Sequence, residues 1–183
     1  MGNAKNYPPC LQLIAAFSRY EAGLDWIWSS VASRFNAIGL LSPRFEFRES
    51  EYYHASMGSP LLKQFAILEA WYDPAELASH KLETNAMESE FANQFRCQEP
   101  RPLNVDPGYM SLTKIVLAST KNREHRVYLR DGIYAEVTLA FRNQHWQPMP
   151  WTYPDYQRED FRVFFLQARK YLTKAISQLG VHD

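Results

Sequence analysis

The sequence predicts an α+β protein with a mixed β-sheet of five to seven strands and three main helices. Short alternating or apolar runs, which are typical of strands, recur along the chain, and longer runs with helical spacing separate them. No internal repeats or low-complexity segments interrupt this order. Because 183 residues suit one domain, we expect a single domain over residues 1–183. The order strand, helix, strand, strand, helix, strand predicts a ferredoxin-like core that a β-hairpin extends.

The chain opens with a strand and a helix. The apolar run over Cys10–Phe17 is typical of a buried strand. Ser18 and Glu21 match a capping box, and apolar residues then recur at helical spacing. We therefore expect a helix over 18–37 that Gly39 ends.

Two strands follow, separated by a polar loop. Residues 44–48 alternate in the manner of a half-solvated strand, and Leu62–Trp71 is apolar on both faces, as in a central strand. The segment 49–60 between them is polar and indicates a loop. Asp73 then precedes a proline and favours a brief turn of helix.

The next helix is predicted over 85–97, where Asn85 and Glu88 form a second capping-box match. The sequence Asp106-Pro-Gly after it fits a type II turn. In a functional alternative, Asp106 and Asn104 hold a cation or a ligand hydroxyl. Residues 113–119 favour a strand through their β-branched side chains, although a two-turn helix is also compatible.

A hairpin is centred on Asp131-Gly132. A three-residue loop with a bulged Gly132 sorts polar and apolar side chains better than a two-residue turn does. In that register Leu129 faces Ile133, Val127 faces Ala135 and His125 faces Val137 on the core side. The opposite face places Tyr128 against Tyr134 and Arg126 against Glu136, with Thr138 beside them.

The chain closes with an irregular connection and a helix. Three prolines lie in Gln147–Pro154, so we expect no regular element there. An apolar stripe predicts the last helix over 156–179, with Asp155 available to cap its start.

The polar face of the hairpin has two interpretations. One is a solvated sheet surface with a cross-strand Arg126–Glu136 pair. The other is the floor of a pocket, in which Arg126 binds an anion and Glu136 orients it. A nearby basic run supplies further cations, because arginine and lysine bind phosphate. Trp151 either packs in the core or forms a wall of this pocket.

These patterns give a set of candidate site residues. Glu136, Asp106 and His125 are candidate acid–base groups, although His125 equally fits a partly buried, hydrogen-bonded histidine. The candidate ligand-binding residues are Arg126, Lys114, Lys121, Asn104, Tyr134, Thr138 and Trp151.

Composition limits the class of protein. The 20 basic and 20 acidic residues balance, so no overall field favours nucleic acid or a membrane. Neither a membrane-length apolar run nor a signal peptide is present, and we expect a cytoplasmic protein. Two distant cysteines and five scattered histidines predict no structural metal. We expect no cofactor, because no glycine-rich nucleotide loop or other cofactor motif occurs.

Five motifs carry a family resemblance. They are NVDPGY (104–109), KIVLASTK (114–121), HRVYL (125–129), DGIYAEVTL (131–139) and PWTYPDY (150–156). In this order they resemble an uncharacterised bacterial family of a domain of unknown function, from about Leu11 to the last helix. Its members are sometimes labelled GTP-binding proteins, and the resemblance implies no established activity. Residues 120–123 lack the aspartate of a guanine-reading motif.

The leading functional hypothesis is a pocket, binding or catalytic, for a small anionic ligand such as a phosphate ester or a nucleotide. The alternative is an interaction module or homodimer that docks through aromatic residues, and a third interpretation is RNA binding. The aromatic residues of that module are Tyr52, Tyr53, Trp151, Tyr153 and Tyr156.

Overall fold

The structure is a computed structural model that describes residues 3, 6–48 and 53–179. Its strands are β1 (Leu11–Ser18), β2 (Ile38–Leu41), β3 (Phe45–Phe47), β4 (Leu61–Trp71), β5 (Leu103–Met110), β6 (Lys114–Ser119), β7 (Val127–Arg130), β8 (Ile133–Arg142) and β9 (His145–Pro148). Its helices are α1 (Glu21–Arg34), α2 (His54–Met57), α3 (Leu77–Phe95) and α4 (Glu159–Gln178), with 3-10 turns at Pro74–Glu76 and Pro154–Gln157. The α+β class is therefore confirmed.

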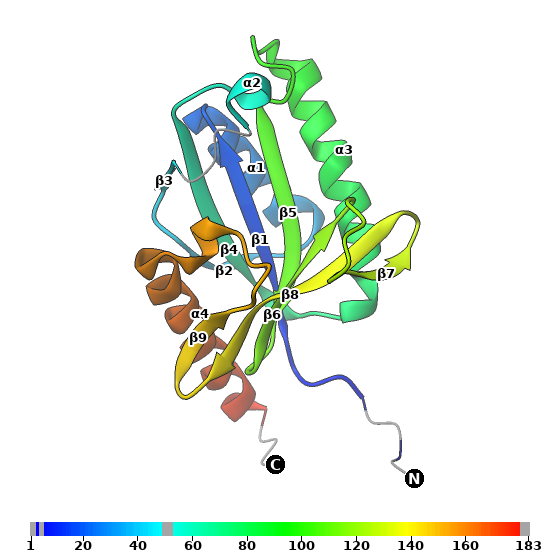
Figure 1. The fold of residues 1–183 in the computed structure, drawn as a ribbon, viewed down its shortest axis with the longest axis vertical. Helices are drawn as coiled ribbons and strands as arrows, with labels where there is room; N and C mark the ends of the chain where they lie inside the picture. The colour runs from blue at the N-terminus through cyan, green and yellow to red at the C-terminus, as the bar shows by residue number, and fades with distance from the viewer. Residues whose placement is uncertain (1–2, 4–5, 49–52, 180–183) are drawn as a thin grey trace.

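One sheet contains all nine strands of the described residues, in the order β2-β4-β1-β5-β6-β8-β7, with β3 on β4 and β9 on β8. The elements β1-α1-β2-β4-α3-β5 follow the βαββαβ order of the expected ferredoxin-like unit. Every pairing in the sheet is antiparallel, where a mixed sheet was expected. The strands β6 to β9 extend the unit through two hairpins (Figure 1).

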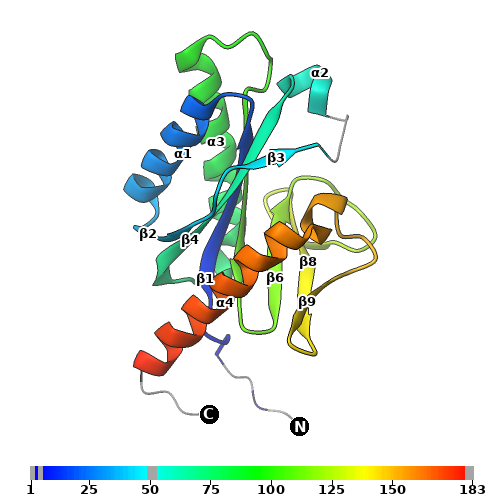
Figure 2. The same cartoon turned by 90° about the vertical axis from the view of Figure 1, so that its left-hand side faces the viewer.

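Helices cover both faces of the sheet. Figure 2 shows α1 and α3 on one side and α4 on the other. Ile14 of β1 packs in the core with α1 and α3, whereas its neighbour Leu13 packs in the core with α4. Because both faces are covered, all eight residues of β1 are buried, as the apolar run predicted.

Three predicted helix starts are wrong, because the capping side chains have other partners. Ser18 is the last residue of β1, and its hydroxyl donates to the carbonyl of Pro102 at 2.6 Å. Glu88 lies inside α3, which begins at Leu77, and accepts from the amide of Val105 at 2.7 Å. Asp155 pairs with Lys63.

Three further details of the predicted elements need correction. Gly39 lies in β2 and does not end α1, whose last residue is Arg34. The ambiguous segment 113–119 contains strand β6. Gln147 and Pro148, expected in an irregular segment, belong to β9, which pairs with β8 through a turn at Asn143 and Gln144. By contrast, Asp73 caps the turn at Pro74–Glu76 as predicted, accepting from the Ala75 amide at 2.9 Å.

The predicted type II turn at Asp106 is also wrong, because this segment lies inside β5. Pro107 pairs with Ile14 of β1. β6 pairs with β5 only from Gly108 onward, so Pro107 has a neighbouring strand on one side. A proline is tolerated in a strand under that condition.

The β7/β8 hairpin turns on two residues rather than three. Asp131 and Gly132 both have positive φ, at 53° and 75°. The register shifts between Tyr128 and Arg130. Beyond this shift the pairs are the expected ones, with Val127 opposite Ala135 and Tyr128 opposite Tyr134. Arg130, not Leu129, lies opposite Ile133.

The core face predicted for β7 is wrong as well. β7 is an edge strand of the sheet, and the side chains of Val127 and Leu129 are 69% and 39% exposed. His125 precedes the strand and contacts Glu136 instead of facing Val137. The apolar side chain of Ile133 on β8 is thus buried, at 1% exposed, whereas the apolar side chains of β7 are exposed to solvent.

The sheet divides between β5 and β6, and this fork positions the site. The two strands pair only over Gly108–Met110 and Ile115–Leu117. Beyond this contact β6 and β8 slant away from β5 (Figure 1). The approach at the fork is close, because a Cβ added to Gly108 would lie 2.2 Å from the carbonyl oxygen of Val116.

Candidate functional site

A cavity of about 610 Å3 fills the fork between β5 and β6. Its volume is typical of small-molecule sites, which occupy about 300–1,000 Å3. Side chains of the ferredoxin-like unit line one side, and residues of β6, β8 and the segment before α4 line the other. Aromatic rings of Phe17, Phe47, Tyr53 and Tyr156 lie among them.

Positive charge dominates the lining. Six cationic side chains contribute to it: Lys63, Lys81, Arg101, Lys121, Arg123 and Arg126. Three carboxylates do so: Asp106, Glu136 and Asp155. Six minus three leaves an excess of three positive charges in a partly enclosed space, which favours an anionic ligand.

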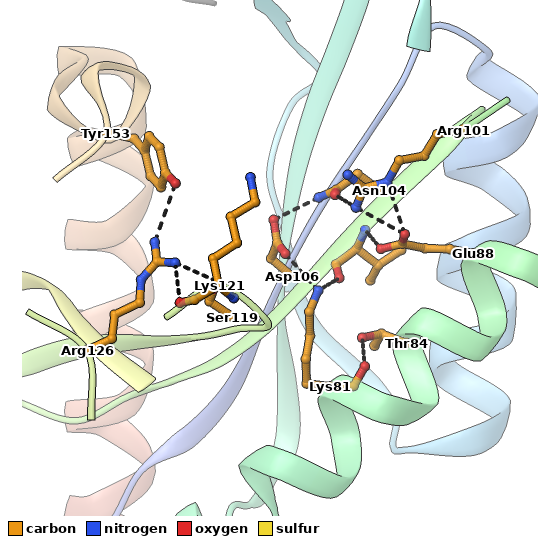
Figure 3. A network of polar contacts seen from close by, with 11 residues as sticks. Lys81, Thr84, Glu88, Arg101, Asn104, Asp106, Ser119, Lys121, Arg126 and Tyr153 are labelled. Atoms are coloured by element: carbon orange, nitrogen blue, oxygen red, sulfur yellow. Dashed lines mark hydrogen bonds and ion pairs between the residues drawn. The ribbon is translucent and has the colours of Figure 1, made fainter. Parts of the chain in front are cut away.

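The first of two polar networks, the β5/α3 network, consists of Lys81, Glu88, Arg101, Asn104 and Asp106 (Figure 3). The Lys81 ammonium donates to Asp106 Oδ1 and to the carbonyl of Val105, both at 2.8 Å. Asn104 donates to Asp106 Oδ2 at 2.7 Å. Burial opposes ionisation of Asp106, but Lys81 and these hydrogen bonds outweigh it, so the Asp106 pKa is lowered.

Arg101 and Glu88 complete this network. Arg101 contacts the Glu88 carboxylate at 3.1 Å and donates to Asn104 Oδ1. Burial raises the pKa of Glu88 despite the nearby charges of Lys81 and Arg101. Each cation of the network thus has a carboxylate partner, and each oxygen of Asp106 accepts a hydrogen bond.

The second, the β6/β8 network, joins Ser119, Arg126, Glu136 and Tyr153 with the carbonyl of Lys121. Arg126 Nε donates to Glu136 Oε2 at 2.7 Å, and both side chains are 3% exposed. One terminal nitrogen donates to Ser119 Oγ at 2.8 Å and to Lys121 O at 2.9 Å. The other contacts Tyr153 Oη at 3.4 Å. Arg126 therefore ties the 119–126 loop to β8.

Lys121 and Arg123 extend from this loop and line the cavity. Figure 3 shows the Lys121 side chain in the space between the two networks. The side chain of Arg123 forms no hydrogen bond or ion pair with any other described residue and is exposed, while its backbone carbonyl accepts from the Arg126 amide at 3.0 Å. Both side chains therefore contribute positive charge to the lining of the cavity.

A buried ion pair lies deeper in the same cavity. Lys63 Nζ is 2.5 Å from Asp155 Oδ2, and the two side chains are 5% and 6% exposed. The ammonium also lies 4.4 Å from the ring centroid of Tyr156 and within cation–π distance of Phe17 and Phe47. This pair joins β4 to the turn before α4, two elements that no strand pairing connects.

His125 and Trp151 lie on the far side of Arg126. The His125 Nε2 atom is 3.2 Å from Glu136 Oε2, the oxygen that Arg126 also contacts. The imidazole stacks on Trp151 with ring centroids 5.1 Å apart. Trp151 Nε1 donates to the carbonyl of Val137 at 2.9 Å, which fixes the indole.

The structure brings most of the sequence-predicted residues together. Asn104, Asp106, Lys121, Arg126 and Glu136 line the cavity, and His125 and Trp151 line an adjoining hollow.

The other three candidates lie elsewhere. Lys114 is at the opposite end of β6 from the cavity. Tyr134 makes an edge-to-face contact with Tyr128 near the sheet edge. Thr138 is fully buried, and its hydroxyl lies 3.4 Å from Glu136 Oε1, outside the lining of the cavity.

Sequence reasoning missed several lining residues, chiefly Lys63, Lys81, Arg101 and Asp155. Arg123 belongs to the basic run that was considered for phosphate binding. One signal was present: Lys63 interrupts the apolar run of β4, and a lysine is almost never buried without a partner. Lys81 gave no such signal, because the predicted helix began after it.

The aromatic residues of the predicted interaction module are scattered. Tyr156 is buried against Phe165, and Tyr53 packs on Phe17. Trp151 is half-buried, whereas Tyr153 is 45% exposed. Tyr52 lies outside the described residues.

The described part of the chain contains neither a metal-binding cluster nor a membrane-spanning helix. There, no three His, Cys, Asp or Glu side chains are grouped so that they could hold a metal ion. No helix among these residues combines the length and the apolar character needed to span a membrane. Both cysteines are free thiols, and burial raises the pKa of Cys10 to about 11.

The fold and the site define an α+β protein with a ferredoxin-like unit, extended by hairpins, and a cation-rich cavity in a forked sheet. The chain belongs to the family of the domain of unknown function DUF4416, which it matches over residues 8–171. No curated protein and no solved structure matches it.

Proposed function

We propose that the cavity in the fork binds a small anionic ligand that carries a phosphate group. The observation that supports this proposal is the excess of three positive charges among the lining side chains. Phosphate is the favoured anion because arginine side chains bind its oxygens in bidentate geometry and lysine supplies a point charge.

In this proposal the β6/β8 side holds the phosphate. Arg123 and Lys121 contact the anion, together with the hydroxyl of Thr120, which also lines the cavity. Arg126 has a different role, because Glu136, Ser119 and the Lys121 carbonyl already accept three of its five N–H donors. It positions the loop and adds charge from behind.

Asp106 and Glu136 hold cations in place and are not assigned acid–base roles. Both oxygens of Asp106 accept hydrogen bonds, and Glu136 is contacted by Arg126 and His125. The aromatic rings on the other side of the cavity supply an apolar surface for the remainder of the ligand. A phosphate monoester with a planar or sugar group fits these requirements.

Thermal unfolding with four compounds tests the proposal: inorganic phosphate, pyrophosphate, adenosine monophosphate and uncharged adenosine. We expect the phosphate-bearing compounds to raise Tm in a concentration-dependent manner and adenosine not to do so. Arg123→Gln should reduce this rise, because it removes one cation without breaking a described contact. Lys174→Gln, on an exposed position of α4 outside the cavity, should not. A Tm that none of the anions raises would refute phosphate binding.

A second candidate function, self-association, is favoured by the edge strand β7. Three consecutive large side chains, Val127, Tyr128 and Leu129, are 69%, 57% and 39% exposed there. An exposed edge strand can pair with a strand of another chain, and a second copy would cover this apolar surface.

Light scattering coupled to size exclusion tests this candidate. We expect a dimer that Val127→Lys converts to a monomer. Leu41→Lys, an equivalent change on the opposite sheet edge at β2, should leave the dimer intact. A monomeric wild-type protein at all concentrations would exclude the dimer.

A further inference from the structure

A second hollow of about 650 Å3 adjoins the cavity in the fork. Both hollows are lined by Arg123, Arg126 and Tyr153. The second is completed by Glu124, His125, Pro150 and Trp151. Since three residues border both spaces, the two hollows lie on either side of one strip of side chains.

The border between the hollows is cationic. Arg126 contributes positive charge to it, with a terminal nitrogen 3.4 Å from the Tyr153 hydroxyl. Arg123 lines both hollows, and its side chain is exposed. A phosphate or pyrophosphate placed at this border would contact Arg123 and lie in the positive field of Arg126.

The second hollow contains a fixed aromatic surface. The imidazole of His125 and the indole of Trp151 are nearly parallel, at 7° between their planes. Each ring is held by a hydrogen bond, to Glu136 and to the Val137 carbonyl respectively. Such pre-organised rings favour stacking of a flat ligand group, because little conformational freedom is lost on binding.

The first hollow also offers aromatic rings, and Tyr153, which borders both, is 45% exposed. Each hollow has the volume of a site for one nucleoside-sized group. The arrangement is thus aromatic on both sides and cationic at the border.

We infer that the ligand is bipartite: two flat aromatic groups joined by a phosphate or pyrophosphate link, as in a dinucleotide. This inference rests on the proposed function, because the linking phosphate occupies the cations assigned there. One aromatic group lies in the fork and the other lies against Trp151 and Tyr153. A mononucleotide fills only half of the site.

Titration calorimetry with adenosine monophosphate and diadenosine pyrophosphate tests the inference. We expect the dinucleotide to bind wild-type protein at least about tenfold more tightly, since stacking of one base on an aromatic side chain contributes about 1–3 kcal/mol. Trp151→Leu and Tyr153→Leu should each remove most of this gain, and Trp151→Leu, whose ring lies outside the cavity in the fork, should leave mononucleotide affinity within about twofold. Tyr128→Leu, an exposed aromatic outside both hollows, is the matched control.

The outcomes separate the two proposals. A dinucleotide that binds no more tightly than the mononucleotide overturns the bipartite ligand and leaves phosphate binding in the fork intact. The bipartite ligand is also overturned if both leucine variants still bind the dinucleotide more tightly than the mononucleotide by the wild-type factor. Because Trp151→Leu loses a hydrogen bond, its ligand-free melting curve is compared with that of Tyr153→Leu, whose side chain is more exposed. If neither nucleotide binds wild-type protein, the bipartite ligand fails, and the proposed function fails with it only if inorganic phosphate and pyrophosphate also leave Tm unchanged.

Discussion

The two networks that face each other across the fork differ in how their charges are matched. The β5/α3 network contains two cations, Lys81 and Arg101, and two carboxylates, Asp106 and Glu88. On the β6/β8 side, the cavity lining contains one carboxylate, Glu136, and three cations, Lys121, Arg123 and Arg126. The β5/α3 network is therefore electrically balanced, whereas cations outnumber carboxylates among the lining side chains of the β6/β8 side. We therefore expect the proposed anionic ligand to bind on the β6/β8 side and the β5/α3 network to maintain the shape of the cavity.

Burial also differs between the two networks. Both Arg126 and Glu136 are 3% exposed at their side chains, whereas Lys81 is 4% and Asp106 is 32% exposed. Removal of the cation lowers stability more when the remaining carboxylate is buried than when it retains contact with water. The comparison therefore predicts an order of mutational effects.

The largest expected effect is that of Arg126→Ala on stability. It leaves Glu136 buried without its guanidinium partner, with only the contacts from His125 and Thr138, and we expect the free energy of unfolding to fall by about 3–5 kcal/mol. Urea denaturation measures this loss. The double variant Arg126→Ala with Glu136→Ala should recover part of it, because no uncompensated charge remains. A loss below about 1 kcal/mol would contradict the proposed strength of the β6/β8 network.

Lys81→Met should destabilise the protein less, by about 2–3 kcal/mol, because Asp106 keeps the hydrogen bond from Asn104 and partial contact with water. The same urea experiment, run beside Arg126→Ala, measures the difference. If Lys81→Met were the more damaging variant, the argument from burial would be wrong.

A matched pair of added charges tests where the ligand lies. Thr120→Asp places a carboxylate on the β6/β8 side and Asn85→Asp places one on the α3 side, and both residues line the cavity. We expect the first to weaken binding of a phosphate ester about tenfold, since like charges repel at short range, and the second to weaken it less than about threefold. Calorimetric titration with adenosine monophosphate gives both affinities. Equal effects would remove the distinction between the two sides.

The smallest expected effect is a pH dependence of stability in acid. The pKa of Asp106 is lowered in the folded protein, so its contribution is present above the ordinary value of 3.8 and is lost as the pH falls through the folded value. Wild-type stability should therefore decline more steeply below about pH 4 than that of Asp106→Asn. Chemical denaturation between pH 3 and pH 7 compares the slopes. Parallel curves would show that Lys81 does not stabilise the ionised form.

Local patterns sufficed for much of the fold. Apolar runs located β1 and β4 to within a residue, because burial on both faces leaves a clear signal. Helix starts failed where a serine or a carboxylate matched a capping pattern but bonded to a residue distant in sequence, as Ser18 does with Pro102. These hydrogen bonds are tertiary contacts, and a short stretch of sequence does not reveal them.

The candidate site shows the same limit. The cross-strand neighbours Arg126 and Glu136 were predictable, because they are close in sequence and share one face of a hairpin. The pair formed by Lys63 and Asp155 was not, because 92 positions separate the two residues. The partners of Arg126 on Ser119 and the Lys121 carbonyl likewise became visible only in the folded chain.

Gly108 has a consequence for where this protein can evolve a new specificity. A Cβ on residue 108 would lie 2.2 Å from the Val116 carbonyl oxygen, so no side chain fits there and β5 and β6 can approach closely only because this residue is glycine. Beyond this contact the two strands separate. A single hydrogen atom in place of a side chain thus sets the depth at which the hollow begins. Lining residues can change while that depth stays constant, whereas replacing this one glycine would move the base of the hollow itself.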